Sequence, residues 1–158
     1  MISGHGLLLL LASLFVGWVT AWIPLHGLAA FVRPDLVALS LIYWSWRHPE
    51  RFGVLTAWWV GVISDLVLGS WLGVHALAYA LMIYFFLNIH HRFRIYPMLQ
   101  QSVLIFLLVG IAIMVIHWIN QLTGVAARDL MFMLGAIGSA LCWPFVRYTL
   151  DYLGGKTV

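Results

Sequence analysis

Apolar residues fall into six long runs along the chain, and short polar stretches separate these runs. A transmembrane helix needs about 20 mainly apolar residues to cross a hydrocarbon core of about 30 Å. The runs predict helices at about residues 7–23, 34–46, 52–69, 71–89, 98–119 and 130–150. Because the connections are short, we expect neighbouring helices to be antiparallel. No long hydrophilic stretch interrupts the pattern, which predicts a single transmembrane helical domain over residues 1–158.

Composition points the same way. Hydrophobic residues make up 64% of the chain and charged residues 8%, and the mean hydropathy is +1.01. Soluble domains carry about 25% charged residues, so this chain is expected to be an all-α, polytopic integral membrane protein. Its net charge of +3 then indicates basic cytoplasmic loops and not binding of nucleic acid.

The basic residues divide unevenly between the two sides that six spans would create. One side holds Arg33 and Arg128, and the other holds Arg47, Arg51, Arg92, Arg94, Arg147 and Lys156. The positive-inside rule makes the richer side cytoplasmic, so both termini are expected in the cytoplasm. We expect a basic cytoplasmic rim that contacts anionic lipid head groups, formed by Arg47, Arg51, Arg92 and Arg94 with His48, His90 and His91 beside them.

Asp65 is a carboxylate inside an apolar run. Such a group costs about 2.5–3.5 kcal/mol at a helix centre and usually has a partner within the bundle. Arg33, on the same predicted side, is the first candidate partner, and His75 is the second. Asp65 could be a polar clamp between helices, a contact for a ligand or partner, or a proton-relay or catalytic acid. We favour the clamp, because a proton path needs further acids or histidines at depth.

Small residues recur every four positions around Asp65, at Gly53, Ala57, Gly61, Gly69 and Gly73. Steps of four residues drift about 40° around a helix, so the first positions form a narrow winding groove. Gly69 and Gly73 are expected to serve the turn that follows. The last helix carries a second small set: Gly135, Ala136, Gly138, Ser139 and Ala140. Such grooves admit a close helix, either from the same chain, which we favour, or from another protein.

The second predicted helix is unusually short, since residues 34–46 extend only about 20 Å. Pro34 suits a first helical position, and Asp35 complements the positive end of the helix dipole. Two interpretations stay open. Arg33, Pro34 and Asp35 either form a simple helix cap at the outer surface or belong to a broken entry that lines a cavity.

The sequence holds no pattern typical of a metal site or an active site. His90 and His91 are adjacent, and no two histidines have the spacing of one helical face. No nucleophile motif and no phosphate-binding glycine loop is present. We therefore expect neither an enzyme nor a bound cofactor or metal ion.

Two stretches carry a resemblance to a known family. RPDLVALSLIYW, at residues 33–44, is followed by GVISDLVLGSWLGVHALAYAL, at residues 61–81. Within the second, D-L-x-x-G-x-x-L-G-x-x-A-L runs from Asp65 to Leu77. Set beside the R-P-D element, this pattern resembles the bacterial rod shape-determining protein MreD family. The pair Trp143-Pro144, the chain length and the short basic tail also fit.

The resemblance implies a role in the elongasome, the inner-membrane machinery that inserts peptidoglycan along the side wall of rod-shaped bacteria. MreD-like proteins are regarded as non-enzymatic and act with MreC, the cytoskeletal MreB, the polymerase RodA and a class B penicillin-binding transpeptidase. Their six-helix fold is similar to the substrate-binding subunits of energy-coupling-factor transporters. That similarity is compatible with a ligand pocket in the bundle.

Two functional hypotheses follow. In the first, the chain is an inner-membrane scaffold that binds MreC directly. Gly61, Asp65, Gly69 and Gly73 would then shape the bundle, Arg33, Pro34 and Asp35 its outer mouth, and the basic rim would face MreB or lipid. In the second, the chain is a small-molecule or lipid-binding, transporter-like subunit in which Arg33, Asp35, Asp65 and His75 converge. A dry, fully packed outer half would count against the second hypothesis.

Overall fold

A computed structural model describes residues 4–24, 27, 31–124 and 133–154 of the chain. Six helices form it: α1 (Gly4–Trp22), α3 (Leu36–Arg47), α4 (Val54–Leu68), α5 (Val74–Phe93), α6 (Met98–Leu122) and α7 (Leu134–Leu153). Each corresponds to one of the six predicted runs, and no strand occurs among the described residues. The expectation of an all-α fold is therefore confirmed for this part of the chain.

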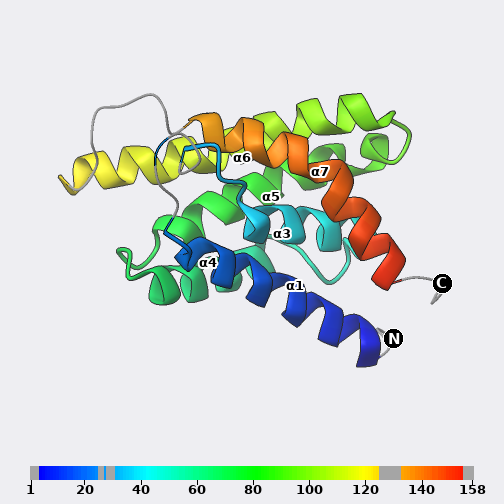
Figure 1. The fold of residues 1–158 in the computed structure, drawn as a ribbon, viewed down its shortest axis with the longest axis horizontal. Coiled ribbons are helices and arrows are strands. Elements are labelled where there is room, and N and C mark those ends of the chain that lie inside the picture. The colour runs from blue at the N-terminus through cyan, green and yellow to red at the C-terminus, as the bar shows by residue number, and fades with distance from the viewer. Residues whose placement is uncertain (1–3, 25–26, 28–30, 125–132, 155–158) are drawn as a thin grey trace.

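The short helix α3 lies at the centre of the bundle, between α1 and α7 (Figure 1). Every residue from Val37 to Ser45 is buried. A helix that is apolar all round belongs in a core, and α3 contacts α1, α5, α6 and α7. Its shortness has the same explanation, because a helix enclosed by its neighbours need not match the thickness of a bilayer.

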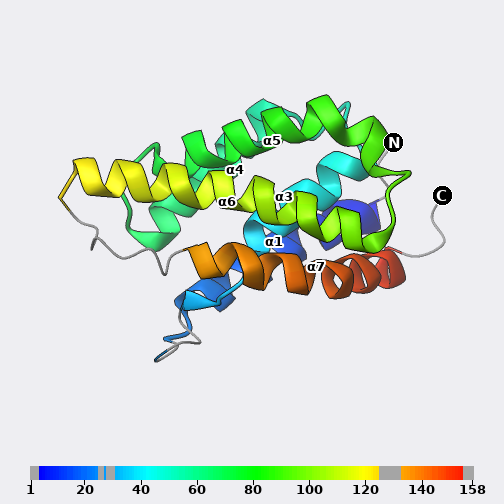
Figure 2. The same ribbon diagram turned by 90° about the horizontal axis from the view of Figure 1, so that it is seen from above.

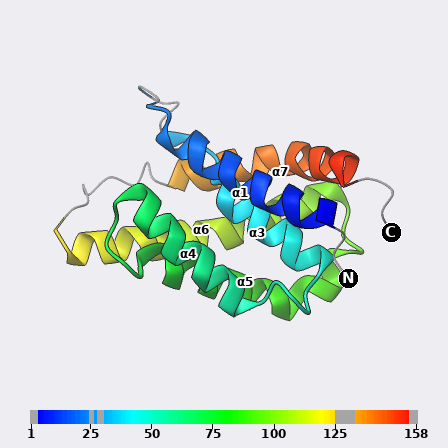
Figure 3. The same ribbon diagram turned by 90° about the horizontal axis from the view of Figure 1, so that it is seen from below.

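The other helices surround α3 as a series of antiparallel neighbours. Figure 2 shows α6 between α5 and α7, and Figure 3 shows α4 against α5, with α1 crossing α3. Pro144 lies inside α7, and α7 bends in Figure 1 as expected where a proline removes a backbone hydrogen bond.

Large apolar side chains cover the outside of the bundle. Exposed examples are Leu8 on α1, Leu55 on α4, Leu107 on α6 and Phe145 on α7. Two helices, Val74–Phe93 and Met98–Leu122, are long and apolar enough to cross a membrane by length and composition, whereas the apolar stretches Gly6–Trp22 and Val54–Leu68 are shorter.

The helix ends gather at two ends of the bundle. The first, which we call the cavity end, contains the C-terminal ends of α1, α4 and α6 and the N-terminal ends of α5 and α7 (Figure 1). The second, the basic end, contains the beginning of α1, the end of α7 and most of the arginines: Arg47, Arg51, Arg92, Arg94 and Arg147. Arg128 and Lys156, which we used to predict orientation, lie outside the described residues.

Candidate functional site

Asp65 is fully buried at the cavity end and caps the next helix. Its Oδ1 accepts hydrogen bonds from the Ser70 hydroxyl at 2.7 Å, the His75 backbone N–H at 2.9 Å and the His75 ring Nδ1 at 2.8 Å. Its Oδ2 accepts from the Gly73 N–H at 2.8 Å. A carboxylate placed on the unpaired N–H groups of a helix also complements the helix dipole. Asp65 of α4 therefore supplies the N-terminal cap of α5.

The turn between α4 and α5 explains the glycines on either side. The Asp65 carbonyl accepts the N–H groups of Gly69 and Ser70, which ends α4. Gly69 has φ 66° and Gly73 has φ 103°. Both values lie in the left-handed region, where a side chain is strained. The spacing of Asp65, Gly69 and Gly73 thus describes a helix end, a left-handed turn and the start of the next helix.

Gly61 allows α4 and α5 to approach closely. A Cβ atom at this position would overlap the backbone of Ala76. On α7, a Cβ atom at Gly138 would overlap the Val32 carbonyl, and one at Gly135 would lie 3.2 Å from the Arg33 carbonyl oxygen. At these positions both predicted small-residue grooves are filled by the chain itself, by α5 in one case and by residues 31–33 in the other.

Asp35 ties the beginning of α3 to two other helices. Its Oδ1 accepts the Ala38 N–H at 2.9 Å, its Oδ2 accepts the Tyr79 hydroxyl at 3.0 Å, and its own N–H donates to the Ser139 hydroxyl at 2.9 Å. Asp35 is therefore the N-cap. Pro34 lies one residue before it and is not the first helical residue, because a side-chain cap defines the helix start more strongly than the fixed φ of proline.

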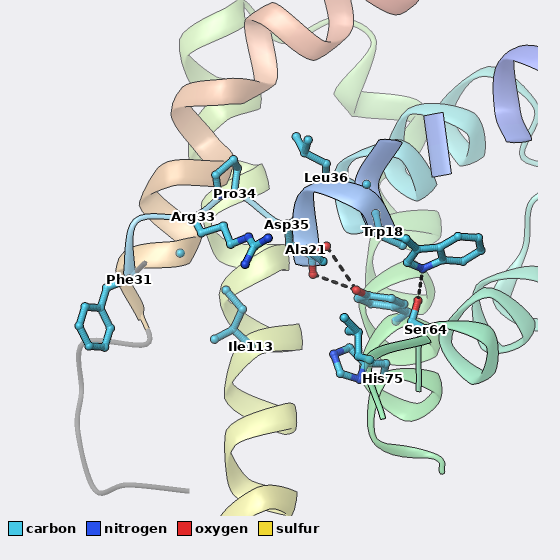
Figure 4. Close-up of a pocket in the computed structure, with 15 residues that line it drawn as sticks. Trp18, Ala21, Phe31, Arg33, Pro34, Asp35, Leu36, Ser64, His75 and Ile113 are labelled. Carbon is cyan, nitrogen blue, oxygen red and sulfur yellow. Dashed lines mark hydrogen bonds between the residues drawn. The ribbon is translucent and has the colours of Figure 1, made fainter. Parts of the chain in front are cut away.

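A cavity of about 440 Å³ lies between these two capping sites. Figure 4 shows Arg33 entering it from the segment before α3, with Ile113 of α6 below and His75 and Ser64 across from it. Its polar lining is formed by Arg33, Asp35, Ser64, His75 and Tyr79, and its apolar lining includes Trp18, Ala21, Phe31, Leu36, Leu68 and Ile113. Arg33, Asp35 and His75 thus converge, while Asp65 lies behind His75 with no exposed surface. Both interpretations of residues 33–35 hold in part: Asp35 caps α3, and Arg33, Pro34 and Asp35 line a cavity.

The expectation that Arg33 pairs with Asp65 is wrong. Asp65 pairs with His75, the second candidate, because α5 begins only a short turn away in the chain. Within the described residues, Arg33 makes no ion pair, and its Nη2 is buried without a hydrogen-bond partner. The cavity end therefore contains a carboxylate saturated by donors and an arginine without a counterion.

Comparisons with known proteins decide the family. A family model for rod shape-determining protein MreD matches residues 3–153 of the chain. The chain belongs to the MreD family. It is similar to the rod shape-determining protein MreD of Haemophilus influenzae, with 31% identity over 115 residues, which cover 73% of this chain and 71% of that protein. No solved structure gives a significant match to the chain.

In this MreD-family chain, the basic end is organised around Asp151. The Asp151 carboxylate accepts the Tyr43 hydroxyl at 2.8 Å and lies 3.6 Å from the side-chain nitrogens of both Arg47 and Arg147. Arg147 also donates to the Gln101 side-chain oxygen at 2.6 Å and lies over the Trp46 ring. These contacts join α3, α6 and α7.

The predicted basic rim is therefore smaller than expected. Arg47 is partly buried and paired with Asp151, whereas Arg51, Arg92 and Arg94 are exposed. Burial, and then the charges of Arg47 and Arg51, lower the pKa of His48, so His48 adds no charge at neutral pH. The sequence could not reveal this pairing, because Asp151 lies at the far end of the chain from Arg47.

Several residues that organise the two ends of the bundle were missed from sequence. Tyr79 bonds to Asp35, Ser64 accepts the Trp18 ring N–H at 2.9 Å, and Gln101 donates to the Phe93 and Tyr96 carbonyls. Ser64 has a signal that could have found it, because it is a polar residue inside an apolar run, whereas Gln101 lies in the polar stretch 100–102 near the start of α6. Among the described residues, no group of three His, Cys, Asp or Glu could hold a metal ion.

Proposed function

We propose that this chain is a non-enzymatic scaffold of the rod-shape machinery in the bacterial inner membrane. In this proposal all six helices lie in the bilayer, and the basic end, with both termini, faces the cytoplasm. Membership of the MreD family supports the role in rod shape determination. The apolar outer surface and the two helices long enough to span a membrane support the location. A fold similar to energy-coupling-factor subunits stays a prediction.

The scaffold would bind MreC directly and, through it, join MreB, RodA and a class B penicillin-binding transpeptidase. The glycine positions tested above are filled internally, so a partner helix must dock elsewhere. The exposed cations Arg51, Arg92 and Arg94 remain available for MreB or for anionic lipid head groups.

A groove between α1 and α7 is the docking site that we assign to the transmembrane helix of MreC. Both helices contact α3, which lies between them (Figure 1). The groove has a volume of about 380 Å³. Its lining combines small side chains with larger apolar ones such as Leu9, Val16 and Phe145. The small side chains are Ala12, Ser13, Ser40, Cys142 and Thr149. Small residues let a second helix approach closely in a membrane, where apolar burial alone gives no preference for helix contact. Membership of the MreD family is the single observation that carries the scaffold role, and this groove carries the choice of docking site.

The test is co-purification of the tagged chain from its native cells in mild detergent, with MreC measured by mass spectrometry. Ala12→Trp fills the groove and is expected to reduce MreC recovery at least tenfold. Leu55→Trp is the matched control, because Leu55 is exposed on α4 and away from the groove. Absence of MreC from the wild-type preparation would overturn the scaffold proposal. Equal recovery with both variants would overturn the groove as the docking site.

Ligand binding by a transporter-like subunit is the second candidate function. One observation favours it: the cavity end is hollow, and Arg33, Asp35 and His75 meet there. The cavity and the groove share only Pro34 and Leu36 among their lining residues, so one chain can perform both functions.

A further inference from the structure

Arg33 brings an uncompensated positive charge to the cavity. It makes no ion pair with any described residue, and its Nη2 is shielded from solvent without an acceptor. Arg33 as a whole is half-buried, but a donor nitrogen that is shielded from solvent and has no acceptor is unfavourable, so such groups normally have a partner. An anion bound in the cavity would supply the missing partner.

The nearby carboxylates do not fill this role, because other donors already occupy them. Asp65 accepts hydrogen bonds from Ser70, Gly73 and His75 and has no surface in the cavity. Asp35 accepts the Ala38 N–H and the Tyr79 hydroxyl. Each of these carboxylates also lies at the N-terminus of a helix, whose dipole offsets negative charge. Each carboxylate therefore has hydrogen-bond donors on both of its oxygens, whereas Nη2 of Arg33 has no acceptor.

The remaining walls indicate what carries the anion. Trp18, Phe31, Leu68 and Ile113 present apolar surface to the cavity. A volume of about 440 Å³ is within the range of small-molecule sites. The cavity also lies among helix ends, and in the orientation proposed above, with all six helices in the bilayer, this end lies at the level of the lipid head groups. An anion attached to an apolar body fits this combination better than a fully hydrated ion.

We propose that the cavity binds the phosphate group of an anionic amphiphile, with Arg33 as its phosphate-binding residue. The planar guanidinium can donate two parallel hydrogen bonds to phosphate oxygens, and the apolar walls hold the adjoining part of the ligand. This inference rests on the ligand-binding candidate and goes beyond the scaffold role. It names a ligand class and the residue that recognises it.

Native mass spectrometry of the full chain, released from detergent micelles, tests the proposal with three probes. Phosphatidylglycerol is an anionic amphiphile, phosphatidylcholine is a lipid of no net charge, and glycerol phosphate carries the phosphate without an apolar chain. The wild type should retain phosphatidylglycerol about tenfold more strongly than phosphatidylcholine and should not retain glycerol phosphate.

Arg33→Gln is expected to abolish the preference for phosphatidylglycerol, and Arg33→Lys to keep part of it. Arg147→Gln is the matched control, because Arg147 lies at the basic end, pairs there with Asp151 and is not assigned to lipid, and it should keep the preference of the wild type. Ala21→Phe fills the cavity without changing its charge and should also lose the lipid. This variant keeps the proposal testable if Arg33→Gln does not fold.

Two results would overturn the inference. Equal retention of phosphatidylglycerol by wild type, Arg33→Gln and Ala21→Phe would place the lipid elsewhere. Equal binding of glycerol phosphate and phosphatidylglycerol would make the ligand a free phosphate compound and not an amphiphile. The scaffold proposal is tested by a different measurement, the recovery of MreC with wild type and with the groove variant Ala12→Trp. Failure of the lipid proposal therefore leaves the scaffold proposal intact.

Discussion

The two ends of the bundle use their charges in opposite ways. At the basic end, Arg47 and Arg147 share Asp151, and Arg147 also bonds to Gln101. At the cavity end, both carboxylate oxygens of Asp65 accept hydrogen bonds from the start of α5. Arg33 has no counterion among the described residues. An arginine near a helix end can therefore join helices, as Arg147 does, or have a guanidinium nitrogen without a partner, as Arg33 does. Its partners, and not its position in the chain, distinguish the two.

The largest effect is expected from Asp65→Leu, which breaks the cap at the cavity end. The variant leaves the N–H groups of Gly73 and His75 and the His75 ring without their acceptor. Stranding buried donors in this way should cost about 3–5 kcal/mol of unfolding free energy. Reversible unfolding in detergent measures the loss, and Asp65→Asn, which keeps one acceptor oxygen, should lose less. If Asp65→Leu is as stable as wild type, the Asp65 cap does not stabilise the fold.

Gly61→Ala tests the close approach of α4 to α5 that holds Asp65 over the start of α5. The added methyl group would overlap the Ala76 backbone, so overpacking should cost about 1–3 kcal/mol. Gly110→Ala is the matched control, because its nearest neighbour, the Ala136 Cβ, would lie 3.9 Å away. The control should be neutral or gain up to about 1 kcal/mol from helix propensity. Equal effects of the two substitutions in an unfolding titration would contradict the helix contact.

Arg147→Gln tests the basic end. The substitution removes the bond to Gln101, the ion pair with Asp151 and the contact with Trp46. Because the Arg147 side chain is 24% exposed, we expect a moderate loss of about 1–2 kcal/mol in unfolding free energy. Part of the loss should disappear in high salt, which screens the ion pair. A loss that salt leaves unchanged would assign the effect to side-chain contacts alone.

The smallest effect on stability is expected from Arg33→Gln in lipid-free protein. Arg33 has no ion pair to lose among the described residues, so the unfolding free energy should change by less than about 0.5 kcal/mol. The same chemical change thus has different consequences at the two ends. A loss as large as that of Arg147→Gln would show that Arg33 is a structural tie.

The sequence predicted the elements well because each run of apolar residues is long and bounded by polar or helix-breaking residues. It also placed Gly69 and Gly73 in a turn, where both have positive φ. The helix start at residues 34–36 was shifted by two positions, since Pro34 and Asp35 compete to define it and the side-chain cap prevails.

Contacts between segments far apart in the chain could not be predicted from the sequence. Asp35 is bonded to Ser139, and Tyr43 to Asp151, over more than a hundred residues of chain. Apolar spacing alone does not reveal which helices are neighbours, so the pairing of Arg47 was missed. The Asp65–His75 pair is local and could have been ranked first, because closing a short turn loses less conformational entropy than closing a long connection. The cavity depends on how α1, α3, α4, α5, α6 and α7 pack, which no single stretch encodes.

The most direct test of the contrast between the two ends is thermal unfolding of wild type, Arg33→Gln and Arg147→Gln, with and without phosphatidylglycerol. A ligand that binds only the folded state raises the unfolding temperature. We expect the lipid to raise the unfolding temperature of wild type and Arg147→Gln but not that of Arg33→Gln, whose lipid-free stability should be close to that of wild type. An equal rise in all three proteins, or a lipid-free loss in Arg33→Gln as large as in Arg147→Gln, would contradict this expectation.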